Sequence, residues 1–219
     1  MSLVTEIKHL IAKDMRQEWR QRYALNGILL YVVAAVFVVY QAMKIDDKPT
    51  WNAIFWIILL FTSVSSAAKS FIQESRGRWL YYYQLASPQA VIISKTIYNS
   101  LLMVVMSLLC MVFYSLLIGN MADNIPMFLL VALLGSLGFS AVLSMTSAIA
   151  SKAGNSNLLM PVLSIPSMIP LLLVTIKASK ASIDGLTNEI ILKDCLVLFV
   201  FYLAIAALGY ILFSFLWKE

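Results

Sequence analysis

The chain has 219 residues, of which 61% are hydrophobic and only 12% are charged, and its formal net charge is +5. Soluble domains carry roughly 25% charged residues, and a soluble core of this size cannot hide so much apolar surface. The composition therefore excludes an ordinary soluble protein and predicts an all-α integral membrane protein. The positive charge is read as a topology signal, so no nucleic-acid partner is expected.

Residues 1–23 are predicted to form an N-terminal amphipathic helix that lies at the membrane interface. Ile7, Ile11, Met15 and Trp19 recur at four-residue intervals, while Lys and Arg side chains fill the other faces. A basic helix with one apolar stripe is typical of a segment that rests among lipid headgroups. We expect it to anchor and orient the span that follows.

Residues 24–219 are predicted to form a domain of six transmembrane helices. Each apolar run is close to or above the ~20 residues that are needed to cross the hydrocarbon layer. The connection Asn120–Asn124 is so short that the third and fourth spans must be antiparallel neighbours. The predicted spans are residues 24–43, 51–70, 91–119, 125–150, 158–176 and 195–216.

The distribution of basic residues predicts that both termini lie in the cytoplasm. With the N-terminus inside, eleven of the sixteen Lys and Arg residues fall in inside segments and five in outside segments. Loops rich in Lys and Arg stay on the cytoplasmic side of a membrane. The segment between the second and third spans is then cytoplasmic too.

The segment between those spans, residues 71–95, is the longest polar interruption among the early apolar runs. Gly77 is expected to break the incoming helix, and Ser87 with Pro88 reads as the N-cap and first residue of the next one. A surface segment with several aromatic side chains can dock a partner, although an ordinary interfacial loop with an aromatic belt is the alternative. The candidate docking residues are Glu74, Arg76, Gly77, Trp79, Tyr82, Tyr83 and Pro88.

The fourth span carries small residues at every fourth position, which allows a neighbouring helix to approach closely. Helix packing is the favoured interpretation, and a substrate path is the alternative. The residues of this strip are Ser136, Ser140, Ser144 and Ala148.

The fifth span contains Pro161, Pro166 and Pro170 within ten residues. Each proline removes a backbone donor and clashes with the preceding turn, so the span is predicted to be kinked or broken. Membranes tolerate such a helix where neighbours or water satisfy the freed carbonyls, so we expect it to line an internal surface or a translocation path. Residues 177–194 follow as the longest outside loop, either plainly solvated or folded into short interfacial or re-entrant helices.

Several kinds of chemistry are not indicated. No glycine opens a Walker A pattern, no cysteine pair has metal-ligand spacing, and no Asp, Glu, Arg or His lies well inside a predicted span. Intramembrane ionisable residues are the usual mark of proton relays and membrane catalysis. The sequence therefore predicts neither a catalytic nor a metal site, and it places any energy source on another chain.

Three stretches together resemble the CcmB family, the permease subunits of bacterial haem exporters that act in cytochrome c maturation. The first has Phe71, Glu74 and Gly77, then an aromatic stretch and Ser87-Pro88, and Ser94-Lys95 at the opening of span three. The second is Lys152 with Gly154 ahead of L-L-M-P at 158–161, and the third is P-S-M-I-P-L-L-L at 166–173. The resemblance covers nearly the whole chain.

This resemblance implies a permease of the ABC exporter type in the bacterial inner membrane. It implies a separate CcmA-like ATPase, CcmC-like and CcmD-like membrane subunits, a second permease subunit and membrane lipid as partners. No cofactor is expected on this chain alone, and haem is expected as a transported or handled ligand. The alternatives are the permease of a lipid, polysaccharide or drug exporter, a membrane-embedded transferase and a passive scaffold.

Overall fold

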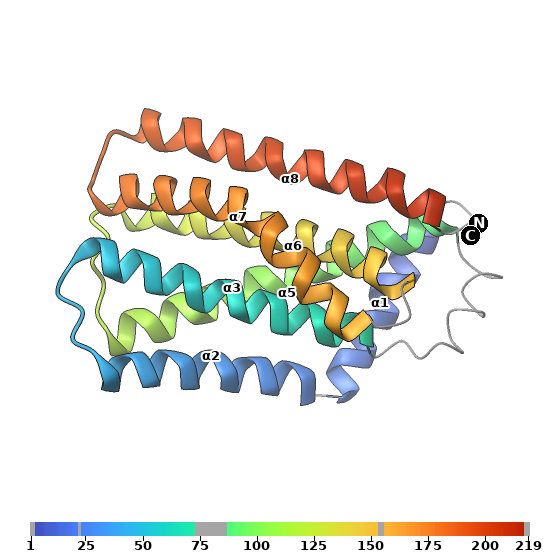
Figure 1. Cartoon of the computed structure of the whole chain (residues 1–219), viewed down its shortest axis with the longest axis horizontal. Coiled ribbons are helices and arrows are strands. Elements are labelled where there is room, and N and C mark those ends of the chain that lie inside the picture. The colour runs from blue at the N-terminus through green and yellow to red at the C-terminus, as the bar shows by residue number, and fades with distance from the viewer. Residues whose placement is uncertain (1–2, 22, 73–86, 153–155, 217–219) are drawn as a thin grey trace.

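The computed structural model describes residues 3–21, 23–72, 87–152 and 156–216. Within these ranges the chain is helical apart from its connections, and most of the long helices lie side by side (Figure 1). The helices are α1 (Leu3–Gln21), α2 (Tyr23–Ala42), α3 (Lys48–Ile72), α5 (Pro88–Leu117), α6 (Ile125–Lys152), α7 (Ser156–Ile183) and α8 (Asn188–Leu216).

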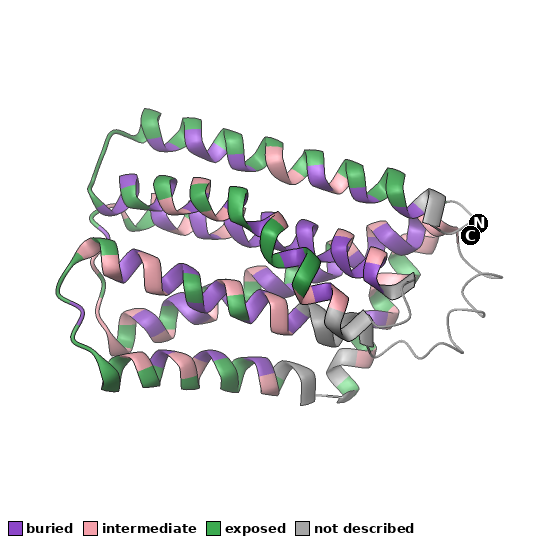
Figure 2. Ribbon diagram, in the orientation of Figure 1, coloured by how far each residue is buried: buried purple, intermediate pink, exposed green. Residues whose placement is uncertain are grey.

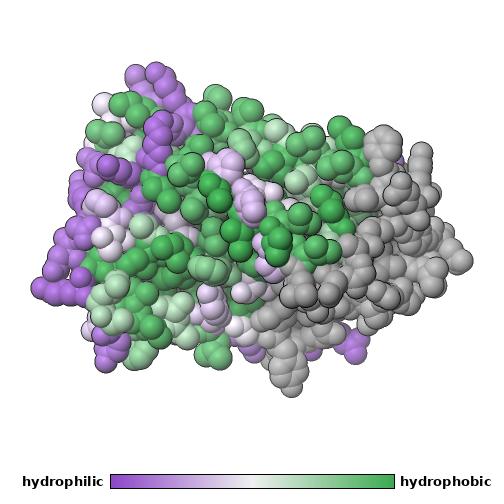
Figure 3. Space-filling view, viewed as in Figure 1, coloured by the Kyte–Doolittle hydropathy of each residue, from purple (hydrophilic) through white to green (hydrophobic). Residues whose placement is uncertain are grey.

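Five of these helices are long and apolar enough to cross a membrane. They are α3, α5, α6, α7 and α8, and the apolar part of α2 adds a shorter stretch of 17 residues, Asn26–Ala42. The length and apolar composition of these helices make the chain a multi-pass membrane protein. Figure 3 shows a broad hydrophobic surface over the middle of the bundle and hydrophilic side chains at one end.

The bundle has two distinct ends. At the turn end lie the connections 43–47, 118–124 and 184–187; at the opposite end, the α1 end, α1 packs against α5 (Figure 1). Because all three connections described at the turn end are short, neighbouring helices alternate in direction.

Helix α6 is the centre of the bundle. It contacts α3, α5, α7 and α8, and 67% of its apolar window is buried, compared with 22% for α8. Figure 2 shows the consequence, with exposed residues along the outer faces of α2 and α8. The contact between α5 and α6 confirms that the third and fourth predicted spans are neighbours.

The prediction of a long loop over residues 177–194 is wrong. Helix α7 continues to Ile183 and α8 already begins at Asn188, so only four residues connect them. Gly185 has φ +67, and the backbone N–H of Leu186 donates to the carbonyl of Ala181 at 3.0 Å, as in a glycine-terminated helix. Of the apolar residues in this range, Ile183 ends α7, Leu186 lies in the connection, and Ile190 and Ile191 belong to the first turn of α8.

The three prolines bend α7 but do not break it. All three lie inside one continuous helix, and Figure 1 shows its ribbon changing direction part-way along. Pro166 and Pro170 have no N–H to donate to the carbonyls of Val162 and Pro166, four residues earlier in the helix. The kink thus has an identifiable cause in the proline positions.

Aromatic rings fill the core between α3, α5 and α6. Trp51 lies 5.1 Å from Tyr114 and 5.3 Å from Phe128, measured between ring centroids. The Trp51 indole donates to the carbonyl of Gly119 at 2.9 Å, and the Tyr114 hydroxyl donates to the carbonyl of Trp51 at 2.9 Å. The indole N–H of Trp51 and the hydroxyl of Tyr114 thus both have hydrogen-bond partners. The cluster therefore stabilises the turn end without leaving either polar group buried and unsatisfied.

We expect Gly135→Ala to destabilise the bundle. A Cβ at position 135 would lie 2.6 Å from the outer ring of Trp56 and 2.9 Å from a methyl of Thr175. Trp56 cannot move away freely, because its indole donates to Ser179 at 2.8 Å. Overpacking of this kind costs ~1–3 kcal/mol, which thermal unfolding in detergent would register as a lower midpoint.

Gly209→Ala is the matched control for that substitution. Its new Cβ would meet only Met145, at an ordinary 3.6 Å, and alanine favours a helix over glycine by ~1 kcal/mol. The control should unfold at the wild-type temperature or above it. Equal behaviour of the two variants would contradict the packing argument.

Candidate functional site at the α1 end

The predicted docking segment itself lies almost entirely outside the described residues. This applies to Glu74, Arg76, Gly77, Trp79, Tyr82 and Tyr83, so their role stays a prediction. The residues that directly follow this segment are described, however, and the predicted start of the next helix at Ser87 and Pro88 is confirmed. Ser87 is the N-cap of α5, its hydroxyl accepts from the backbone N–H of Ala90, and Pro88 is the first helical residue.

Glu6 of α1 holds this helix start. Its carboxylate accepts the Ser87 hydroxyl at 2.8 Å and the Ser87 backbone N–H at 3.2 Å. These two hydrogen bonds, that of the hydroxyl first, hold the pKa of Glu6 below its ordinary value. The N-cap serine of α5 is therefore fixed by a residue that is 81 positions away in the sequence.

A second polar contact joins the same two helices. The carboxylate of Asp14 in α1 lies 3.3 Å from the Lys95 ammonium in α5, and both side chains are nearly buried, at 6% and 7% exposure. Lys13 approaches the other Asp14 oxygen at 2.9 Å. Charges are rarely buried unless they are paired, so this pair is a specific feature of the α1–α5 contact.

Sequence reasoning missed this ion pair. Lys95 was read as an inside charge at the opening of span three, with no partner expected, whereas the structure places it two turns inside α5. A signal was present, because Asp14 stands three residues after Ile11 and so shares the inner face of α1. An acidic residue on the apolar side of a basic helix indicates a buried partner.

The face of α1 that packs on the bundle differs from the four-residue apolar pattern. Met15 is 48% exposed, whereas Leu10, which the four-residue pattern omitted, packs against a buried cluster that contains Val91 and Phe213. Ile7 and Ile11 are half-buried. The inner face of α1 follows the 3.6-residue helical period rather than the four-residue spacing.

The small-residue strip of α6 is buried along its whole length, and two of its three serines bond to α5. Ser140 lies 3.1 Å from the hydroxyl of Ser100, and the Asn99 amide donates to Ser144 at 2.9 Å. Ser136 donates to the carbonyl of Leu133 within α6, and Ala148 belongs to the buried cluster beneath α1. This polar seam ties α5 to the centre of the bundle.

The proline face of α7 points away from the core of the single chain. Pro166 and Pro170 are exposed and Pro161 is half-buried. The expectation that these prolines line an internal surface or a translocation path of an assembled complex stays a prediction. Their neighbours on this face are large exposed apolar residues: Val162, Leu163, Ile165, Ile169 and Leu173.

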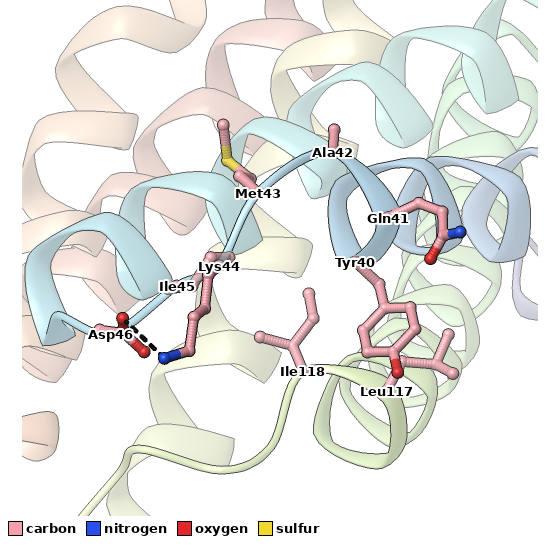
Figure 4. Close-up of a pocket in the computed structure, with 9 residues that line it drawn as sticks. All are labelled: Tyr40, Gln41, Ala42, Met43, Lys44, Ile45, Asp46, Leu117 and Ile118. Atoms are coloured by element: carbon pink, nitrogen blue, oxygen red, sulfur yellow. Dashed lines mark ion pairs between the residues drawn. The ribbon is translucent and has the colours of Figure 1, made fainter.

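The turn end carries paired charges and a pocket. Lys48 donates to Asp123 at 2.7 Å and to the carbonyl of Ile183 at 2.9 Å, which ties the start of α3 and the end of α7 to the connection 118–124. The pocket has a volume of about 500 Å³, and beside it Lys44 pairs with Asp46 at 3.5 Å (Figure 4). Its lining residues are Tyr40, Gln41, Ala42, Met43, Lys44, Ile45, Asp46, Leu117 and Ile118.

In the part of the chain that the structure describes, no cluster of three His, Cys, Asp or Glu side chains could hold a metal ion. The helices instead define a multi-pass membrane protein whose amphipathic α1 is bonded to the start of a membrane helix. The family model described as CcmB protein matches residues 5–214, which is nearly the whole chain, so the chain belongs to the CcmB family. A search of curated proteins finds no match.

Membership of this family sets the general role. CcmB proteins are membrane subunits of the haem export system of cytochrome c maturation, and they are permease subunits that are not themselves catalytic. The resemblance recognised from the sequence is thereby confirmed.

Proposed function

We propose that this chain is the permease subunit of an ABC transporter that exports or delivers haem for cytochrome c maturation. The observation that carries the proposal is the family match over residues 5–214. A separate CcmA-like ATPase drives the complex, because these 219 residues contain no Walker A pattern. CcmC-like and CcmD-like membrane subunits complete it and handle the haem.

The α1 end is the face that meets the ATPase in this proposal. It contains α1 and the start of α5, which follows the predicted docking segment directly. Six helices, α2 among them, cross the bacterial inner membrane, and a second permease subunit covers the exposed proline face of α7. The cargo is haem itself or a haem chaperone that is released by the complex.

Gentle purification of the tagged chain from its native bacterium tests the proposal. A P-loop ATPase identified by mass spectrometry should co-purify in stoichiometric amount, and deletion of the gene should abolish covalently bound haem in c-type cytochromes. The b-type cytochromes, which bind haem without this pathway, should remain as the internal control. Normal c-type cytochromes in the deletion strain would refute the proposed function.

The orientation is tested by reporter fusions. Reporters after Asn120 and near Asp184 should be external, whereas reporters after Gly77, Gly154 and Glu219 should be cytoplasmic. The reason is the eleven-to-five distribution of Lys and Arg between the two sides. An external reporter after Gly77 would reverse the topology and remove the docking segment from the ATPase side.

A further inference from the structure

The two contacts between α1 and α5 have matching spacing. Glu6 and Asp14 are eight residues apart on α1, and their partners Ser87 and Lys95 are eight residues apart on α5. Eight residues of helix span ~12 Å, so α1 is held at two points over two turns of its neighbour. Two points fix both the position and the direction of a helix, whereas one contact leaves it free to swing.

The first contact also controls how α5 begins. The Ser87 hydroxyl donates to Glu6 while it accepts from the Ala90 backbone N–H at 3.4 Å. The carboxylate therefore sets the rotamer in which Ser87 caps the helix. Any displacement of α1 at Glu6 acts directly on the first turn of α5.

The second contact resists separation more strongly. Lifting α1 would separate Asp14 from the Lys95 ammonium, and both side chains are nearly buried, at 6% and 7% exposure. Breaking a buried ion pair by removing one partner is strongly unfavourable, so α1 and α5 are expected to move together.

The path continues from α5 into the bundle. Asn99 and Ser100 follow Lys95 by about one turn, and they bond to Ser144 and Ser140 of the central helix α6. A displacement at the start of α5 thus reaches α6 through consecutive buried polar contacts.

We propose that α1 is a latch on α5, in which Glu6 and Asp14 are positioning residues that make the membrane helices follow movement at the α1 end. This rests on the proposed function, because the movement is supplied by an ATPase on another chain. The latch is defined as the Glu6–Ser87 and Asp14–Lys95 contacts. When it is broken, ATP hydrolysis continues but no longer drives the transport step.

The test compares Asp14→Asn with Arg16→Gln and with the double variant Asp14→Lys plus Lys95→Asp. Arg16 is the matched control, since it is exposed on the same helix and loses one charge as well. The double variant restores opposite charges across the contact. It therefore distinguishes the effect of losing the ion pair from the effect of changing the side chain at position 14. All variants are compared in membrane level and in co-purification of the ATPase.

Hydrogen exchange of α1 in lipid nanodiscs is the first readout, and it needs no partner protein. Asp14→Asn should raise the exchange of residues 3–17 at least about tenfold, because local opening becomes easier when the pair is lost. Arg16→Gln should leave it unchanged, and the double variant should return it most of the way to wild type. Unchanged exchange in Asp14→Asn would overturn the latch.

Cytochrome c yield per ATP hydrolysed is the second readout. It should fall roughly tenfold in Asp14→Asn at unchanged ATPase co-purification and recover in the double variant. Raised exchange with a normal yield would show that the pair is structural only and would refute the positioning role. If Asp14→Asn is poorly inserted, the double variant is used in its place as the test of the latch. A double variant in which hydrogen exchange and cytochrome c yield do not both return toward wild type would count against the proposal. A wild-type chain that supports no maturation refutes the proposed function, while the exchange result still stands for the latch.

Discussion

Trp79→Ala combined with Tyr83→Ala is expected to release the ATPase, or to uncouple its hydrolysis, while the membrane helices stay inserted. Aromatic anchors bury large areas at low entropic cost, and truncating one that is central to an interface typically costs ~2 kcal/mol or more. That figure corresponds to ~30-fold weaker association for a single anchor. Membrane level and ATPase co-purification, measured side by side, report the two effects separately.

Two controls accompany this double variant. Arg76→Ala removes a charge at the rim of the proposed interface and should change little, because rim charges contribute much less than buried anchors. Phe37→Ala with Tyr40→Ala removes two exposed aromatics of α2, nearer the turn end, and should leave the ATPase bound. If the Trp79 and Tyr83 pair instead lowers insertion while association is retained, these side chains are lipid anchors and the docking role is wrong.

Pro166→Ala combined with Pro170→Ala is expected to impair cytochrome c maturation roughly tenfold while insertion and ATPase binding stay normal. Each proline inside a helix costs ~3 kcal/mol or more through a lost hydrogen bond and a clash with the preceding turn. Replacing both lets α7 straighten, and the exposed face that is proposed to meet a second permease subunit would then change shape.

Pro126→Ala is the control for the proline variant. Pro126 lies in the first turn of α6, where no backbone N–H needs a partner within the helix and proline carries little penalty. This variant should mature cytochromes normally. Full activity of the Pro166 and Pro170 double variant would show that the prolines are merely tolerated.

The sequence determined the class, the family and the local helix signals. Apolar runs of about 20 residues are a requirement of the bilayer, so they are visible without any tertiary information. The start of α5 was equally local, since Ser87 and Pro88 satisfy the needs of a helix N-terminus by themselves. The short Asn120–Asn124 connection likewise forced α5 and α6 to be neighbours.

Helix ends at the turn end could not be read from hydropathy. The predicted fifth and sixth spans were limited by three charged residues, Lys177, Lys193 and Asp194. Backbone hydrogen bonding in a helix does not, however, require apolar side chains. The Lys177 ammonium pairs with Asp194 across α7 and α8 at 2.8 Å, so both helices continue past their apolar parts. The actual end of α7 depends on Gly185 and on packing that only the folded chain supplies.

Which residues meet across the chain depends on how the helices pack. Asp14 and Lys95 are 81 positions apart, and neither residue type indicates its partner, because the pairing follows from where α1 crosses α5. The outward position of the α7 prolines has the same origin, since α6 occupies the other side of that helix. Local hydrogen bonding and hydropathy are properties of neighbouring residues, whereas the choice of a buried face is made by the helices that compete to cover it.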